Sequence, residues 1–105
     1  MQRVCFTLKL RPDRVPEYID RHRRVWPEMQ AALRDTGWGN YTLFLGPNAL
    51  LIGYLETEDF EEARRSMQAL AINRRWQTEM APFFEPSETS PDDAMRPLPE
   101  LFHLD

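Results

Sequence analysis

Residues 40–56, NYTLFLGPNALLIGYLE, set the architecture of this chain. Its two halves, 40–45 and 49–56, are apolar and aromatic runs of the kind that form strands. Gly46-Pro47-Asn48 separates them, and these residue types favour a tight reversal of the chain. We therefore expect two antiparallel strands joined as a short-looped hairpin.

A third strand is expected before this hairpin, at residues 2–10. Its apolar residues recur at every second position, as in a strand that is buried on one face: Val4, Phe6, Leu8 and Leu10. Pro12 ends the run, and Asp13 is expected to cap a helix that continues through Tyr18 and His22.

Pro27 divides the helical segment between the first strand and the hairpin. A proline this far into a helix removes an amide donor and disfavours helical backbone at the preceding residue, Trp26. We expect a break there and a second helix from Pro27 to Asp35. Gly37 and Gly39 then end this second helix before the hairpin begins.

The chain after the hairpin is expected to be helical from Thr57 to about Phe84, with a break between residues 69 and 73. Acidic residues follow Thr57 closely and would lie at the positive end of the helix dipole. Residues 86–99 are rich in proline, serine and acid, and are expected to form an extended arm. A short terminal strand is expected after the arm, from Leu101, Phe102 and Leu104.

The order strand, helix, strand, strand, helix, strand predicts an α+β fold of the ferredoxin-like type, with an antiparallel sheet and the helices on one face. A chain of 105 residues that is 42% hydrophobic can build one core, so residues 1–105 are expected to be a single domain. The other face of the sheet would be bare unless a second copy covered it. We therefore expect a homodimer, assembled as a dimeric α/β barrel.

Charge and motif content exclude several classes of function. The formal net charge of −4 disfavours binding to nucleic acid or anionic membranes, and no apolar run is long enough to span a membrane. Cys5 is the one cysteine, so no intrachain disulfide can form, and we expect a cytoplasmic protein. The sequence has no H-E-x-x-H, C-x-x-C, G-x-G-x-x-G or Walker motif, so neither a metal nor a cofactor is expected.

Tyr18 and His22 are the first candidates for a functional site. They are four residues apart in the expected helix, so their side chains would lie on one face and could reach one ligand together. Three aromatic residues near the ends of elements could line a pocket between helices and sheet: Trp26, Tyr41 and Trp76. Flat rings beside hydroxyl groups suit a sugar, which has an apolar face and a polar rim. The residues alone therefore indicate a pocket for a small polyol.

Four segments resemble the L-rhamnose mutarotase family in order and spacing. They are Tyr18-x3-His22-x3-Trp26-Pro27-Glu28, Asn40-Tyr41, Arg75-Trp76 and Glu100-Leu101-Phe102-His103-Leu104. The resemblance spans the whole chain. It implies a dimer of ferredoxin-like domains that interconverts the α and β anomers of L-rhamnose without a metal or cofactor. It also implies that His22 is the proton donor, and that Tyr18, Tyr41 and Trp76 line the sugar site.

One departure from the family pattern follows Trp76. Family members often have two consecutive tryptophans, whereas this chain has Trp76-Gln77, so an amide replaces part of the expected aromatic wall. We count Gln77 and Trp26 among the expected sugar-binding residues. The departure leaves open which reducing sugar is preferred, L-rhamnose or a related sugar such as L-fucose or L-lyxose.

Mutarotation needs an acid and a base at the anomeric centre. The ring oxygen is protonated while the anomeric hydroxyl is deprotonated, and the open aldehyde then turns and recloses on its other face. A histidine with an ordinary pKa near 6.5 can do either task, and one such group contributes about 10²- to 10⁴-fold in rate. We expect His22 to protonate the ring oxygen or to serve the reverse step, while Tyr18 or a water handles the anomeric hydroxyl.

The fold class leaves other functions open. Ferredoxin-like dimers also include cofactor-free monooxygenases and non-catalytic binders of small ligands. A monooxygenase would consume oxygen with an aromatic substrate, and a binder would hold a sugar without accelerating anomer exchange. A structural dimerisation unit is the third alternative, and the shared face of Tyr18 and His22 argues against it.

Overall fold

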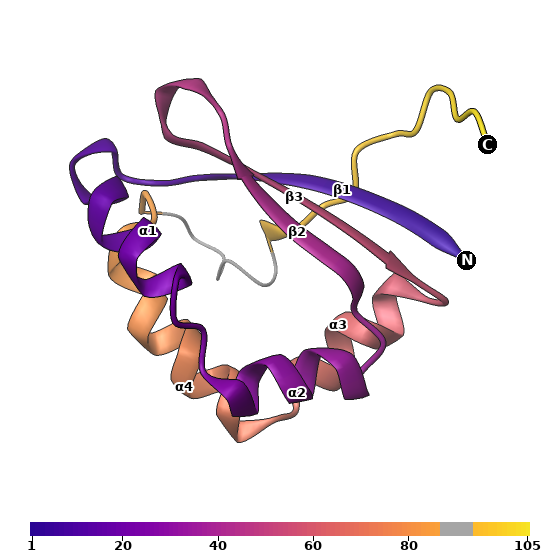
Figure 1. The fold of residues 1–105 in the computed structure, drawn as a ribbon, viewed down its shortest axis with the longest axis horizontal. Helices are drawn as coiled ribbons and strands as arrows, with labels where there is room; N and C mark the ends of the chain where they lie inside the picture. The colour runs from indigo at the N-terminus through magenta and orange to yellow at the C-terminus, as the bar shows by residue number, and fades with distance from the viewer. Residues whose placement is uncertain (87–93) are drawn as a thin grey trace.

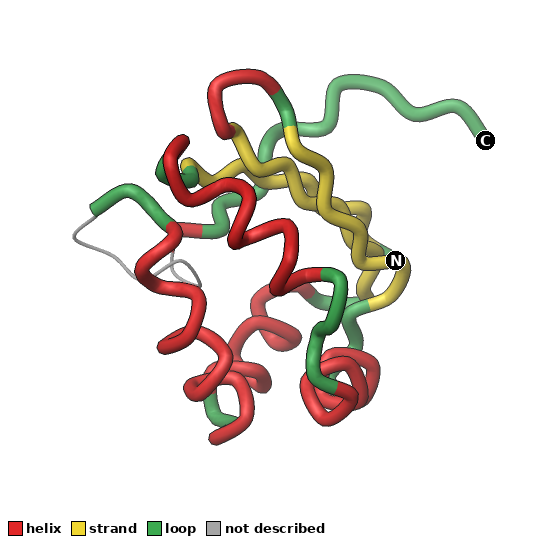
Figure 2. Tube along the Cα trace, turned by 60° about the vertical axis from the view of Figure 1, so that its left-hand side comes forward, coloured by secondary structure: helices red, strands yellow, loops and turns green. Residues whose placement is uncertain are grey.

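The computed structural model describes residues 1–86 and 94–105, and shows a small α+β fold (Figure 1). Within these residues, three strands form one antiparallel sheet in the order β1-β3-β2. All four helices lie on the same side of this sheet, as the two views together show (Figures 1 and 2). The predicted antiparallel sheet with helices on one face is therefore confirmed. The centre of the predicted arm, residues 87–93, lies outside the described residues.

The predicted hairpin is confirmed. β2 (Gly39–Leu45) pairs with β3 (Leu50–Thr57), and the register places Phe44 opposite Ile52. The turn contains Gly46 and a 3₁₀ segment, Pro47–Ala49. Asn48 and Ala49 have φ angles of 59° and 58°, in the left-handed region, which is what reverses the chain here.

The predicted first strand is also confirmed. β1 (Gln2–Lys9) pairs with β3 along its whole length, from Gln2 opposite Thr57 to Lys9 opposite Leu50. Because side chains alternate along a strand, Val4, Phe6 and Leu8 all point to the helices and are buried. Phe6 is fully buried, and it fits because its partner in β3, Gly53, has no side chain: a Cβ there would lie 2.3 Å from the Phe6 ring.

The first helical segment is divided as predicted. α1 (Val15–His22) and α2 (Pro27–Asp35) are separated at Trp26, whose extended backbone (φ −54°, ψ 133°) allows Pro27 to begin the second helix. The predicted cap at Asp13 is wrong, because a 3₁₀ turn over Pro12–Arg14 precedes α1 and contains this residue.

The second helical segment is α3 (Phe60–Gln68) followed by α4 (Ala71–Met80), so the break predicted between residues 69 and 73 is confirmed. Its start, at Phe60, is three residues later than the predicted start at Thr57. Asp59 caps α3 by accepting a hydrogen bond from the Glu62 amide at 3.2 Å. Thr57 is instead the last residue of β3.

The terminal strand predicted at Leu101–Leu104 is absent from the structure. These residues have no secondary structure, and Leu101 and Phe102 are 95% and 80% exposed. The outer edge of β1 is contacted instead by Phe84, which forms a single bridge with Leu10 after α4 ends. α4 ends at Met80, before the predicted helix end at about Phe84, and a 3₁₀ turn over Ala81–Phe83 leads into this bridge.

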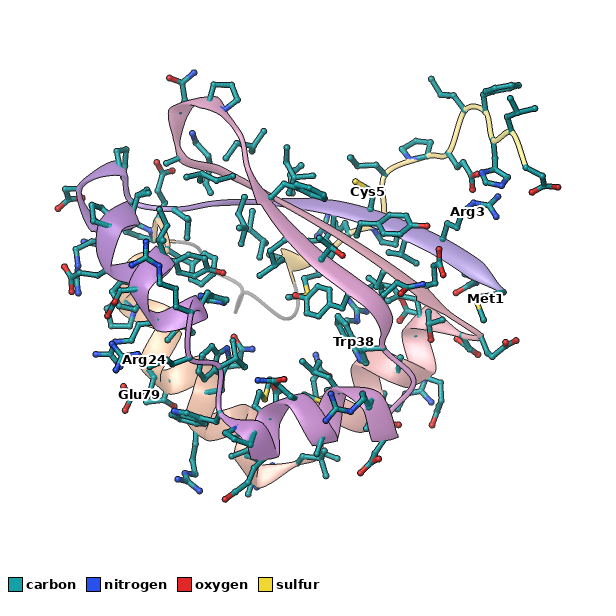
Figure 3. The ribbon with its side chains drawn as sticks, viewed as in Figure 1. Met1, Arg3, Cys5, Arg24, Trp38 and Glu79 are labelled. Atoms are coloured by element: carbon teal, nitrogen blue, oxygen red, sulfur yellow. The ribbon has the colours of Figure 1, made fainter. Side chains whose placement is uncertain are left out.

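Prolines explain why the C-terminal segment does not form a strand. The Leu98 amide donates to the Cys5 carbonyl at the free edge of β1, at 2.7 Å, and Figure 3 shows Cys5 and Arg3 beside this segment. Pro97 and Pro99 on either side of Leu98 have no amide to continue a ladder. Beyond them, only the Arg3–Glu100 ion pair at 2.7 Å holds the described chain to the sheet.

Met95 shows that the described end of the predicted arm is packed against the domain. It is 7% exposed and belongs to the core cluster. This part of the arm therefore does not extend into solvent, although its sequence is polar and rich in proline.

Candidate active site

A cavity of about 610 Å³ lies between the inner face of the sheet and the helices. This volume is in the range of small-molecule sites. The sequence candidates Tyr18, His22, Tyr41, Trp76 and Gln77 all line it. Five of the six residues predicted to bind or transform a sugar are therefore brought to one cavity, from α1, β2 and α4.

His22 is the last residue of α1, and its ring is fixed by its own helix. Its Nδ1 lies 3.0 Å from the Tyr18 carbonyl oxygen, and the two rings stack with centroids 4.1 Å apart. A carbonyl oxygen can only accept a hydrogen bond, so Nδ1 must carry the proton. In the neutral ring, the lone pair is then on Nε2.

Burial sets the charge state of both residues. It lowers the pKa of His22 below its ordinary value of 6.5, with the Tyr18 hydrogen bond acting in the opposite direction. His22 is therefore neutral at pH 7, and its Nε2 can accept a proton. Burial also raises the pKa of Tyr18, so the phenol keeps its proton and can serve as a hydrogen-bond donor.

Trp76 forms the wall of the cavity beside His22. Its side chain is buried, and its ring meets the imidazole edge-on at 5.5 Å between centroids. Trp26 is the sequence candidate that is not among the described lining residues. It packs edge-on against Trp76 at 5.0 Å, with the Arg75 guanidinium 5.6 Å from its ring centroid. Trp26 thus supports the wall from behind.

Tyr41 lines the cavity from β2. Its ring is 5.0 Å from that of Trp38, which is buried and donates its indole N–H to the Ala63 carbonyl at 3.1 Å. Figure 3 shows Trp38 between the start of β2 and the helices. The rings of Trp38 and Tyr41 therefore form one aromatic part of the cavity wall.

Residues 1–86 and 94–105 contain no group of three His, Cys, Asp or Glu side chains that could hold a metal ion. The same residues contain no helix that is long and apolar enough to cross a membrane.

Comparison with known proteins identifies the family. The family model for L-rhamnose mutarotase matches residues 3–104. The chain belongs to the L-rhamnose mutarotase family. The family resemblance of the four sequence segments is thereby confirmed, and with it the prediction of a mutarotase, an enzyme that isomerises anomers. The monooxygenase and simple-binder alternatives are not favoured.

Relatives in this family cover the whole chain. The L-rhamnose mutarotase of Oceanobacillus iheyensis is 39% identical over 100% of both chains, and that of Bacillus subtilis is 36% identical over the same share. The crystal structure of L-rhamnose mutarotase FA22100 from Formosa agariphila superposes with a TM-score of 0.81 over 100% of each chain, at 24% identity. That structure shows that the folds are alike.

In this mutarotase, several lining residues were not predicted from the sequence. Asn73 is a buried polar residue one turn before Trp76 and Gln77, and its spacing on α4 could have pointed to it. Four methionines also line the cavity: Met29, Met67, Met80 and Met95. Methionine is common in cores, so no sequence signal separates these four from ordinary packing residues.

Proposed function

We propose that this chain interconverts the α and β anomers of L-rhamnose, with His22 accepting and returning the proton of the anomeric hydroxyl. The observation that carries the proposal is the hydrogen bond from Nδ1 to the Tyr18 carbonyl. It fixes the tautomer in which Nε2 is a base, on a residue that lines the cavity. The experiment that tests it is the rate of anomer exchange of L-rhamnose, measured by saturation-transfer NMR.

The reaction needs no group beyond this histidine, a hydrogen-bond donor and water. His22 Nε2 takes the proton from the anomeric hydroxyl, the O–H electron pair forms the C=O bond, and the bond from C1 to the ring oxygen breaks. The ring oxygen takes a proton from a water molecule and becomes a hydroxyl, and that water is left as hydroxide beside the protonated His22 until it takes the proton back on reclosure. After the aldehyde turns, the same steps run in reverse on its other face. His22 thus acts first as base and then as acid.

Tyr18 is proposed to position the sugar for this step. Its raised pKa makes it a poor source of a full proton, but a good donor of a hydrogen bond to the ring oxygen or to the water beside it. Trp76 and Tyr41 would hold the apolar faces of the sugar. The methionines of the wall would receive its C6 methyl group.

The pH dependence of kcat/KM follows from the lowered pKa of His22. If the neutral ring is the active form, activity should be level between about pH 7 and 8, because the ring is already deprotonated there. It should fall only when the pH drops below 6.5, through the lowered pKa. The measurement is kcat/KM for L-rhamnose with the uncatalysed rate subtracted at each pH. A rate that falls as the pH rises from 6 to 8 would show that His22 works in its charged form.

We also propose that the chain forms a homodimer of ferredoxin-like subunits in the cytoplasm. The strand order β1-β3-β2, with Phe84 at the outer edge of β1, is that of a ferredoxin-like sheet whose fourth strand is reduced to one bridge. Phe44 is 58% exposed on the face of the sheet away from the helices. One free cysteine, Cys5, suits a reducing compartment.

The dimer predicts a mass of twice the 12.5 kDa chain in sedimentation equilibrium. Phe44→Glu places a charge on the exposed face of the sheet and should yield the single-chain mass, because an unpaired charge is costly to bury. Glu85→Lys changes the charge of an exposed residue next to the Phe84 bridge and serves as the control, with the dimer mass retained. A single-chain mass for the parent protein would contradict the proposal.

A further inference from the structure

We infer that Asn73 and Gln77 act together as the specificity-determining pair of the cavity, with Asn73 holding the Gln77 amide where it recognises a sugar hydroxyl. This inference rests on the proposed function. It concerns two amides on α4 that the proton-transfer step does not use. The inference implies a substrate class of reducing sugars that, when bound in the cavity, present a hydroxyl group to the Gln77 amide.

Asn73 is a polar side chain enclosed by the core. It is 2% exposed, and it shares the cavity wall with Met67 and Met80, both also buried. Burying an amide costs free energy unless its hydrogen bonds are made. Its Oδ1 accepts a hydrogen bond from Gln77 Nε2 at 3.3 Å. This hydrogen bond links the buried Asn73 to Gln77 on the same wall of the cavity.

Gln77 is the partner that can reach a ligand. It is half-buried, it lines the cavity, and one of its two amide hydrogens is engaged by Asn73. The hydrogen bond limits how the side chain can rotate and so lowers the entropic cost of ordering it around a ligand. A primary amide both donates and accepts, as a sugar hydroxyl does.

The position of the pair relative to His22 fits a hydroxyl away from the anomeric carbon. Trp76 meets the His22 ring at 5.5 Å between centroids, and Asn73 lies about one helical turn before it on the same face of α4. A sugar whose anomeric centre is at His22 would therefore present another part of its ring to the amides. The pair would then affect binding of the sugar and leave proton transfer alone.

The test compares KM and kcat for L-rhamnose in Gln77→Leu, Asn73→Leu and the double variant. Each single variant should raise KM about 3- to 10-fold, the value of one neutral hydrogen bond, with kcat within about twofold. The double variant should be no worse than either single variant, because both remove the same interaction. Thr78→Val removes an exposed hydroxyl of α4 that bonds the Arg74 carbonyl, and should leave KM unchanged.

The specificity itself is read from a panel of monodeoxy analogues of L-rhamnose. The parent should have a higher KM for the analogue that lacks the recognised hydroxyl than for L-rhamnose. Gln77→Leu should have similar KM values for both sugars, because the variant has no amide to bind that hydroxyl. Unchanged KM values in both single variants would overturn the inference, as would additive effects in the double variant. Thermal unfolding that drops in Asn73→Leu while KM stays at the parental value would show a structural role only. Failure of the parent to accelerate exchange would overturn the proposed function itself.

Discussion

Trp76→Ala is expected to lower the free energy of unfolding by about 3–5 kcal/mol, the usual cost of removing a buried tryptophan. The indole is 7% exposed and contacts both His22 and Trp26 edge-on. Its removal would leave a void between α4 and the end of α1, which the short helices cannot close without moving. The measurement is urea unfolding followed by far-UV circular dichroism.

Trp26→Ala is the matched control for this prediction. Trp26 is partly exposed and lies behind Trp76, outside the described cavity lining. We expect a smaller loss of stability, about 1–2 kcal/mol, and an unchanged KM for the sugar. Trp76→Ala has the larger cost in free energy of unfolding, so the conservative Trp76→Phe is the variant to use for kinetics. Trp76→Phe should raise KM. If KM rose as much for Trp26→Ala as for Trp76→Phe, this would contradict the assignment of Trp76 to the cavity wall and of Trp26 to its support.

His22→Ala is expected to lower kcat for anomer exchange by about 10²- to 10⁴-fold, the contribution of one positioned acid/base group. The fold should survive, because His22 is the last residue of α1 and its Nδ1 hydrogen bond goes to the backbone of the same helix. Circular dichroism checks this. His103→Ala is the control: it removes the only other histidine, which is exposed in the C-terminal segment, and should leave the rate unchanged.

Strong periodic patterns made most of the fold predictable. Alternation over residues 2–10, the turn formers at 46–48 and the proline at 27 each act through local sterics, and the structure has β1, the hairpin and the helix break at these places. The C-terminal strand could not be judged in this way. Leu101, Phe102 and Leu104 are apolar, but strand pairing also needs backbone amide donors in the preceding segment. Pro97 and Pro99 have no such amides.

The candidate site was predictable where helical spacing or the family resemblance fixed it. Tyr18 and His22 lie on one face as expected, with ring centroids 4.1 Å apart. The role of Trp26 was not predictable, because whether an aromatic residue faces the cavity or supports its wall depends on the rotation of the segment between α1 and α2. Asn73 was missed because an isolated asparagine in a helix is common, and only its burial sets it apart.

The tautomer of His22 is the point that the structure adds to the sequence. The sequence allowed the histidine to donate or to accept a proton first. The Nδ1 contact with the Tyr18 carbonyl and the lowered pKa favour accepting first. The proposed order of proton transfer depends on these two observations.

Saturation-transfer NMR of L-rhamnose, run side by side on the parent protein and on His22→Ala, tests whether His22 carries the proton transfer. With the parent, saturation should pass rapidly between the two anomeric protons. With His22→Ala, the exchange rate should be near that of buffer, and it should recover in part when imidazole is added. Equal exchange rates for the parent and the folded variant would contradict this role of His22.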